Sequence, residues 1–226
     1  SETGAQEVLR LAEALNVPIA TSYLHNDVVP AEHPLSVGPL GYFGHRSAMR
    51  AVHDSDLVIA VGTRIGPFSV TKQDGIDYWS HNKPLIQVDM DRERLGKSCS
   101  PTLPVLADAG LFAAQLADKV DAEGIKFDGG KDIAQEERSR WQKELDELTE
   151  TTTIPEDGAM APRKALKTIG DFIYSLPHGV LSTDIGNVSS QMNSYAKFSQ
   201  PRSYLAPGLF GSCGYSVGAA MGAKVA

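Results

Sequence analysis

Apolar residues near the start of the chain recur at the spacing of a helix. The pattern i, i+3, i+4, i+7 is met by Val8, Leu11, Ala12 and Leu15. It predicts a helix with one buried face. Residues 18–23 follow as a predicted short strand. Residues 26–44 contain three prolines and three glycines and are predicted to be mostly loop.

Continuous apolar runs farther along the chain predict buried strands. Residues 57–61 are all apolar and are bounded by Asp56 and Gly62, which indicates a strand buried on both faces. Residues 84–89 and 104–107 predict two more strands. Helices are predicted over 47–53 and through Phe112, Leu116 and Val120. This alternation predicts an α/β fold in which residues 1–121 form a Rossmann-like, doubly wound domain with a parallel sheet.

The composition changes after this domain. Residues 122–158 are highly charged and contain a predicted helix. Its apolar stripe consists of Trp141, Leu145 and Leu148. We interpret this segment as a linker with an embedded helix, the mixed-sign charges as a solvated face and the stripe as a docking surface.

A second α/β unit is predicted over residues 159–226. Pro162 suits the first turn of a helix, and its apolar face consists of Leu166, Ile169 and Ile173. The segments that follow predict a strand, a helix, a strand and a helix, over 179–184, 188–197, 201–205 and 215–226. Two strands cannot cover a core, so we interpret this unit as an incomplete α/β domain and the chain as a fragment of a longer polypeptide.

Charge and cysteine content exclude several classes of function. The formal net charge of −7 argues against a nucleic-acid-binding protein, because phosphate neutralisation needs clustered basic side chains. No apolar run approaches the ~18 residues of a membrane-spanning helix, so we expect no membrane partner. Cys99 and Cys213 lie far apart without a CxxC motif, which predicts two free thiols in a reducing cytoplasm.

Motifs in the first 121 residues have both chemical and structural interpretations. Residues 62–67 follow a predicted strand, where Rossmann-like domains bind phosphate. They lack GxGxxG spacing, and we interpret them as a tight turn in preference to a phosphate-binding loop. Four histidines fall within residues 25–53, but none forms a ligand pair such as HExxH, and we assign no metal site. Asp91 is interpreted as a helix N-cap in preference to a ribose or cation ligand.

Two motifs of the second unit carry more chemistry. Residues 184–187, Asp-Ile-Gly-Asn, lie at a predicted strand end with a helix to follow. The free N–H groups and positive end of that helix suit a diphosphate. The glycine-rich residues 208–214 let a second backbone segment approach a flat ligand closely. Together the two motifs predict a phosphate-bearing cofactor.

The chain resembles, over essentially its whole length, the acetolactate-synthase-like family of thiamine diphosphate enzymes. The matching segments are 55–64, 85–91, 182–187 and 207–214. The resemblance implies that residues 1–121 are the middle, Rossmann-like domain of that family. It also implies that residues 159–226 open its pyrophosphate-binding domain.

Within this family the chain resembles the sulfoacetaldehyde acetyltransferase branch. The segments that carry this similarity are 22–27, 33–35, 38–42, 62–68, 75–79 and 213–215. Cys213 and Asn187 stand where acetolactate synthases typically have Met and Gln. The resemblance implies conversion of sulfoacetaldehyde and phosphate to acetyl phosphate and sulfite. An acetolactate-synthase-type ligase and a non-catalytic nucleotide-binding module stay open as alternatives.

The resemblance also implies the site. Its cofactor-binding residues are expected to be Asp184, Gly186, Asn187, Gly211, Ser212 and Cys213. No catalytic acid, base or metal ligand is expected in this chain, because the activating glutamate and the Mg²⁺ ligands of the family are expected outside it, the latter beyond residue 226. The fragment alone is therefore expected to be inactive. The full-length protein that contains it is expected to be a homo-oligomer.

FAD is not expected as a cofactor. Bulky aromatic side chains in the loops 24–44 and 67–79 are expected to fill the space that an extended dinucleotide would need. They are Tyr42, Phe43, Phe68, Tyr78 and Trp79.

Overall fold

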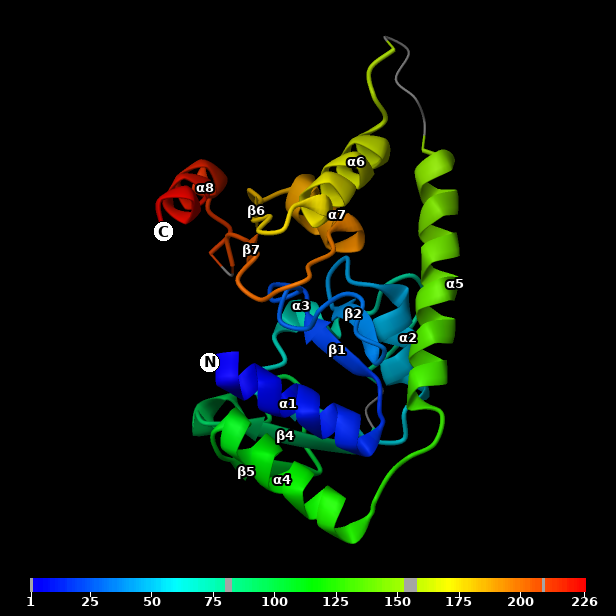
Figure 1. Ribbon diagram of the computed structural model, residues 1–226, viewed down its shortest axis with the longest axis vertical. Helices are drawn as coiled ribbons and strands as arrows, with labels where there is room; N and C mark the ends of the chain where they lie inside the picture. The colour runs from blue at the N-terminus through cyan, green and yellow to red at the C-terminus, as the bar shows by residue number, and fades with distance from the viewer. Residues whose placement is uncertain (1, 80–82, 153–157, 209) are drawn as a thin grey trace.

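The computed structural model describes residues 2–79, 83–152, 158–208 and 210–226. Helices and parallel strands alternate along much of this chain (Figure 1). The α/β class predicted from the sequence is therefore confirmed. Residues 153–157 of the predicted linker and Leu209 of the glycine-rich segment lie outside the described residues.

We call residues 2–121 the first unit and residues 159–226 the second unit; these boundaries stay predictions. The first unit contains α1 (Glu2–Leu15), β1 (Ile19–Ser22), β2 (Ser36–Leu40), α2 (Arg46–Asp54), β3 (Val58–Val61), α3 (Pro67–Val70), β4 (Leu85–Asp89), the 3-10 helix η1 (Arg92–Arg94), β5 (Leu103–Leu106) and most of α4 (Ala109–Glu123), which ends two residues beyond the predicted boundary. Strand β1 pairs with β2, and β3, β4 and β5 pair in that order, all in parallel. Asp91 caps η1 by accepting from the Glu93 N–H, as predicted, although the helix is a single 3-10 turn.

Strand β3 has different neighbours on its two faces. Ile59 packs into a cluster made by α1 and α4, which lie side by side in Figure 1. Ala60 packs in the opposite direction, against Ile65 and Leu85. The prediction that 57–61 is buried throughout is only partly right, because Leu57 is 44% exposed and Ala60 is the only fully buried position. The side chains nonetheless alternate between two covered faces, as in a doubly wound sheet.

The prediction of loop over residues 26–44 is wrong for β2. This strand pairs in parallel with β1 and buries Val37 between α2 and α5 (Gly130–Glu150). Gly38 and Pro39 disfavour a strand by propensity, yet Gly38 adopts a φ of 84° where no Cβ would fit against the His45 ring. Tertiary packing therefore overrides the local signal.

Helix α5 belongs to the cores of both units, so its apolar stripe is more than a docking surface. Ala134 is fully buried against β2 and α2. About two and three helical turns farther on, Trp141 and Leu145 belong to the core of the second unit. The helix runs alongside both parts of the molecule in Figure 1.

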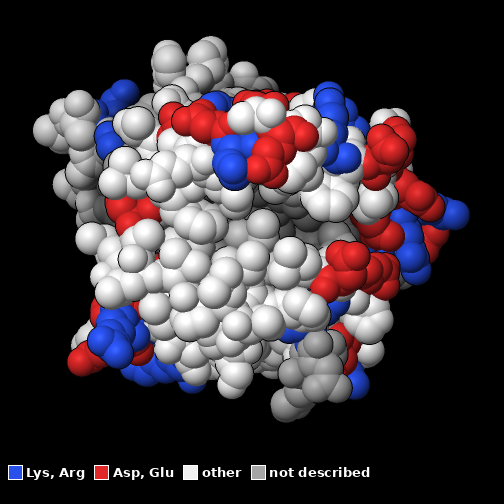
Figure 2. All heavy atoms as spheres, turned by 90° about the horizontal axis from the view of Figure 1, so that it is seen from below, with Lys and Arg blue, Asp and Glu red and all other residues white. Residues whose placement is uncertain are grey.

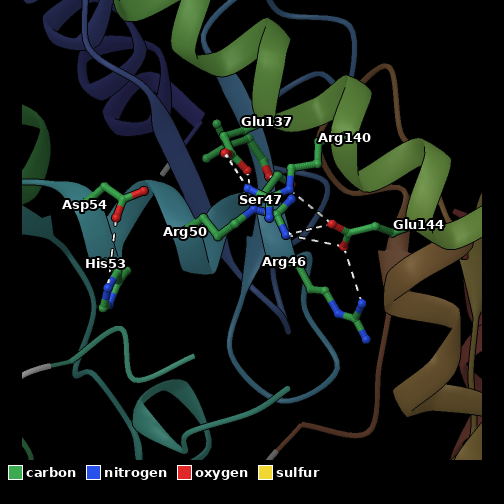
Figure 3. Close-up of polar contacts among 9 residues, drawn as sticks. Arg46, Ser47, Arg50, His53, Asp54, Glu137, Arg140 and Glu144 are labelled. Carbon is green, nitrogen blue, oxygen red and sulfur yellow. Dashed lines mark hydrogen bonds and ion pairs between the residues drawn. The ribbon is translucent and has the colours of Figure 1, made fainter. Parts of the chain in front are cut away.

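The charges on α5 also differ from the prediction of a solvated face. Arg50 of α2 pairs through Nε with Glu137 and through Nη1 with Glu144, the latter at 3.1 Å (Figure 3). Arg46 Nη1 lies 3.3 Å from the second oxygen of Glu144. The side chains of Arg50 and Glu137 are only 10% and 15% exposed. These carboxylates therefore attach α5 to α2.

The second unit contains α6 (Pro162–Ser175), β6 (Leu181–Ser182), α7 (Asn187–Tyr195), β7 (Tyr204–Leu205) and α8 (Tyr215–Val225). The elements match the predicted order, with strands of two residues. The predicted apolar face of α6 is wrong at Ile169, which is 45% exposed. Gly170, next to it, lets α6 approach α7, since a Cβ there would lie 2.7 Å from the Tyr195 carbonyl oxygen.

The surface in Figure 2 has a broad uncharged middle, with Lys, Arg, Asp and Glu toward its margins. Strand β5 is an edge strand of the three-stranded sheet β3-β4-β5, and it exposes Leu103 and Leu106. No helix in the described residues is long and apolar enough to cross a membrane.

Gly130 offers a stability test of the junction at the start of α5. A Cβ built on it would lie 1.8 Å from the Asn16 carbonyl oxygen. We expect Gly130→Ala to lower the free energy of unfolding by ~1–3 kcal/mol, because the backbone must move apart. Gly222→Ala in α8 meets no atom within 4 Å and should leave stability equal or raise it by up to ~1 kcal/mol. Urea denaturation measures both, and equal effects would contradict the contact.

His45 makes stability depend on pH. Its Nε2 lies 3.1 Å from the Asn193 carbonyl oxygen of α7, and its ring packs 5.6 Å from Trp141. Burial lowers the pKa of His45 to about 4, outweighing the hydrogen bond to Asn193, which raises it. The neutral ring is thus favoured in the folded state.

Because the folded pKa lies below the unfolded value, stability is complete above about pH 6.5 and falls as pH decreases toward 4. The loss should reach up to roughly 3 kcal/mol for this one group. His45→Gln should flatten the curve in that interval, whereas His25→Gln, at an exposed position, should not. Denaturation at several pH values checks this, and identical slopes for His45→Gln and wild type would contradict it.

Candidate cofactor site

The site lies at the carboxyl ends of β6 and β7. These strands pair in parallel, with Leu181 opposite Tyr204 and Ser182 opposite Leu205. Parallel strands end at the same edge of a sheet. The turn 184–187 and the glycine-rich segment 208–214 therefore leave the sheet side by side, as ligand-binding loops do in α/β folds.

Asp184 joins the two segments directly. Its Oδ1 accepts from the Ile185 N–H at 2.9 Å, and its Oδ2 accepts from the Gly214 N–H at 2.8 Å. Its Oδ2 also accepts from the Ser216 hydroxyl at 3.3 Å. Gly214 is the N-cap position of α8. The Asp184 carboxylate thus occupies the positive end of α8.

Burial alone would raise the pKa of Asp184, but the hydrogen bonds from Ile185, Gly214 and Ser216 outweigh it and lower the pKa. The carboxylate stays ionised at neutral pH and accepts from all three donors. It fixes the distance between the turn and the glycine-rich segment.

The N-terminus of α7 has no such carboxylate. Gly186 is its N-cap residue, with φ 118° and no side-chain cap, and Asn187 is its first residue. Both residues are exposed, and no atom lies within 4 Å of a Cβ built on Gly186. The first N–H groups of a helix have no partner within the helix. This end of α7 can therefore accept a phosphate group.

The glycine-rich segment faces the turn. Gly208, Gly211 and Gly214 have φ values of 64°, 58° and 82°, which favour glycine. A Cβ on Gly211 would lie 3.2 Å from Ile185 Cδ1, so the segment packs on the turn. Ser212 and Cys213 are exposed next to it. The structure thus brings all six predicted site residues into one corner of the second unit.

Comparison with known proteins decides the family. Residues 1–116 match the central domain of thiamine pyrophosphate enzymes, and residues 184–226 match their C-terminal TPP binding domain. The chain belongs to the thiamine pyrophosphate enzyme family.

Named relatives place it more closely. The chain is 40% identical to the sulfoacetaldehyde acetyltransferase of Castellaniella defragrans and 39% identical to that of Rhodobacter capsulatus, over 98% and 97% of this chain. It spans 39% of the length of each of these relatives. Over 98% of its length, the chain is 29% identical to a probable acetolactate synthase large subunit of Methanococcus aeolicus. The matched part is 37% of that protein.

Sequence analysis missed a buried hydroxyl network beneath this thiamine pyrophosphate enzyme motif. Thr183, just before Asp184, lies 3.3 Å from both the Ser189 and the Tyr204 hydroxyl oxygens. All three residues are buried, and burial raises the pKa of Tyr204. The network links β6, α7 and β7 directly below the turn. The clue in the sequence was three hydroxyl residues on three neighbouring predicted elements.

The motifs of the first unit do not gather into a second site. Gly62 adopts a φ of 64°, which suits a tight turn, and Ile65 in the same segment is buried. His33 pairs with Glu13, and His53 bonds the Asp77 carbonyl oxygen. In the described part of the chain, no group of three or more His, Cys, Asp or Glu residues could hold a metal ion.

Proposed function

We propose that this chain forms part of a thiamine diphosphate-dependent acetyltransferase that converts sulfoacetaldehyde and phosphate to acetyl phosphate and sulfite. The observation that carries the proposal is the corner of the second unit, where Asp184 blocks α8 and leaves the N-terminus of α7 open. Relatives named sulfoacetaldehyde acetyltransferase support the choice of reaction, because they are 36–40% identical, against 27–30% for the acetolactate synthases.

The residues present fit the cofactor. The backbone N–H groups at Gly186 and Asn187 would hold its diphosphate at the positive end of α7. The Gly211 carbonyl would accept from the aminopyrimidine, and Ser212 and Cys213 would pack against the cofactor. Asp184 acts one step away, by holding the glycine-rich segment against the turn. Mg²⁺ accompanies the diphosphate, and we assign it no ligand in this chain.

Bound thiamine diphosphate supplies a nucleophilic carbon for addition to the aldehyde and an electron sink for the carbon that then loses sulfite. The residues of this chain would bind and orient the cofactor. The open approach to Gly186, Gly208 and Gly214 lets the backbone contact a planar group without a Cβ in between.

A flavin is not part of this proposal. Tyr78 is fully buried and donates its hydroxyl to the Thr71 carbonyl at 3.0 Å. Trp79 donates its indole N–H to the Ser69 carbonyl at 2.7 Å. Tyr42 packs edge-on against Phe43, with centroids 4.6 Å apart. These contacts support the expectation that aromatic side chains fill the loops of the first unit.

The experiment uses the full-length protein that carries this segment. With sulfoacetaldehyde, phosphate, Mg²⁺ and thiamine diphosphate, we expect equal release of acetyl phosphate and sulfite, and no flavin absorbance. The 226-residue chain alone serves as the inactive control. Acetolactate formed from pyruvate, with a flavin band, would move the protein to the synthase branch. No cofactor-dependent product with either substrate would leave a binding module.

Cys213 tests the position of the cofactor. Cys213→Met should keep the apparent KM for thiamine diphosphate within about twofold, because an apolar side chain still packs beneath the rings. Cys213→Asp should raise it about tenfold or more, because an unpaired carboxylate would be buried against the cofactor. Titration of the apoenzyme with cofactor measures both. Equal KM values for the two variants would place this side chain away from the cofactor.

A further inference from the structure

A buried carboxylate of the first unit holds the start of β7. Asp27, in the loop after β1, is only 5% exposed. Its Oδ2 accepts from the Ser203 N–H at 2.9 Å and from the Tyr204 N–H at 3.1 Å. The two partners lie 176 and 177 positions farther along the chain. A single oxygen thus joins the two units at the strand that leads into the glycine-rich segment.

The backbone that leads into β7 is shaped to receive this carboxylate. Arg202, just before the two donors, has a φ of 63°, in the left-handed region that is unfavourable for a residue with a Cβ. A left-handed residue in this position can turn consecutive N–H groups toward one anion. The two hydrogen bonds to Asp27 therefore offset the backbone strain at Arg202.

Burial of Asp27 is otherwise unfavourable. None of the ion pairs in the described residues involves it, and a buried carboxylate without a cation is costly unless hydrogen bonds satisfy it. Charge-assisted hydrogen bonds to backbone N–H groups are among the stronger ones in proteins. The cost and its compensation are both concentrated on the first residues of β7.

The position of β7 determines that of the cofactor corner. Leu181 and Thr183 of the β6 segment donate their N–H groups to the carbonyls of Ser203 and Leu205, at 2.8 and 3.0 Å. Thr183 precedes Asp184, which bonds Gly214 at the end of the glycine-rich segment. Hydrogen bonds therefore connect Asp27 to β7 and β7 to the β6 segment, the peptide bond connects Thr183 to Asp184, and a further hydrogen bond connects Asp184 to Gly214.

We infer that Asp27 is a positioning residue for the cofactor site, acting from the first unit on the glycine-rich segment through the start of β7. This inference rests on the proposed thiamine diphosphate function. Other contacts between the units act elsewhere: Ser194 at the end of α7 donates to the Phe43 carbonyl at 3.3 Å, and the Ala31 N–H donates to the Phe198 carbonyl. Asp27 is distinct from these contacts because it bonds β7.

The test compares variants of the full-length holoenzyme. Asp27→Ala removes both hydrogen bonds, and Asp27→Asn keeps an accepting oxygen of the same size without the charge. Ser194→Ala removes another contact between the units. Gly130→Ala lowers stability at a remote position. For each variant we would measure the apparent KM for thiamine diphosphate, kcat at saturating cofactor, melting temperature and amide exchange at Ser203, Tyr204 and Gly214.

We expect Asp27→Ala to raise the KM for thiamine diphosphate about tenfold and Asp27→Asn about threefold, with kcat at saturation within about twofold. Exchange should accelerate at Gly214 as well as at Ser203 and Tyr204. Ser194→Ala and Gly130→Ala should keep the KM for thiamine diphosphate within about twofold of wild type, even where their melting temperatures fall as much as those of the Asp27 variants.

Two results would overturn the inference. One is a KM in the Asp27 variants no higher than in Ser194→Ala and Gly130→Ala at a matched loss of melting temperature. The other is unchanged exchange at Gly214. If Asp27→Ala does not fold, Asp27→Asn decides by the same two readouts. A wild-type enzyme without any dependence on thiamine diphosphate would refute the proposed function instead, and is seen before any variant is compared.

Discussion

Attachment of helix α5 to two cores is the constraint on which the arrangement of the molecule depends. Its first half buries Ala134 against β2 and α2, and its second half buries Trp141 and Leu145 in the second unit. Burial of an apolar side chain of this size contributes ~1.5–3 kcal/mol, whereas a solvent-exposed ion pair contributes at most ~1 kcal/mol. The apolar stripe therefore provides most of the attachment to the second unit, and the mostly buried ion pairs of Arg50 attach α5 to α2.

The same joint brings the first unit to the cofactor corner. His45 and Asp27 both bond backbone groups of the second unit, at the Asn193 carbonyl and at the start of β7. In the corner itself, two helix N-termini lie close together, and the Asp184 carboxylate occupies that of α8. Under the proposed function an anionic ligand would therefore bind at α7, where no atom lies within 4 Å of a Cβ built on Gly186. Selection between two otherwise similar helix ends is made by one side chain.

Local patterns were sufficient for most of the fold and for choosing the two segments that the structure brings together, while the roles of the individual residues in them stay predictions from the family resemblance. Apolar runs identified β3 and β4, and the Asp-Ile-Gly-Asn turn and glycine-rich segment identified the corner that the structure assembles. Strand β2 was missed because Gly38 and Pro39 carry no strand propensity, and only its pairing with β1 makes it one. The role of Asp27 could not be found this way, since its partners lie on a distant segment, and the Thr183 network left only three hydroxyl residues on neighbouring predicted elements as a clue. Sequence spacing reports on neighbours within an element, and these contacts join different elements.

The double role of α5 has a consequence for dividing this protein into independently produced pieces. A cut at residue 121, where composition alone places the end of a domain, would leave Arg50 without its partners Glu137 and Glu144 and would uncover Ala48 of α2, whereas Arg46 would keep only Asp74. A cut before α5 would keep Trp141 with its own core in the second unit. It would separate Ala134 from Val37 and Ala48, the residues against which it packs in the first unit. If α5 is instead kept on the first piece, that piece exposes Trp141 and Leu145 as an apolar surface, to which a separately expressed second piece could bind.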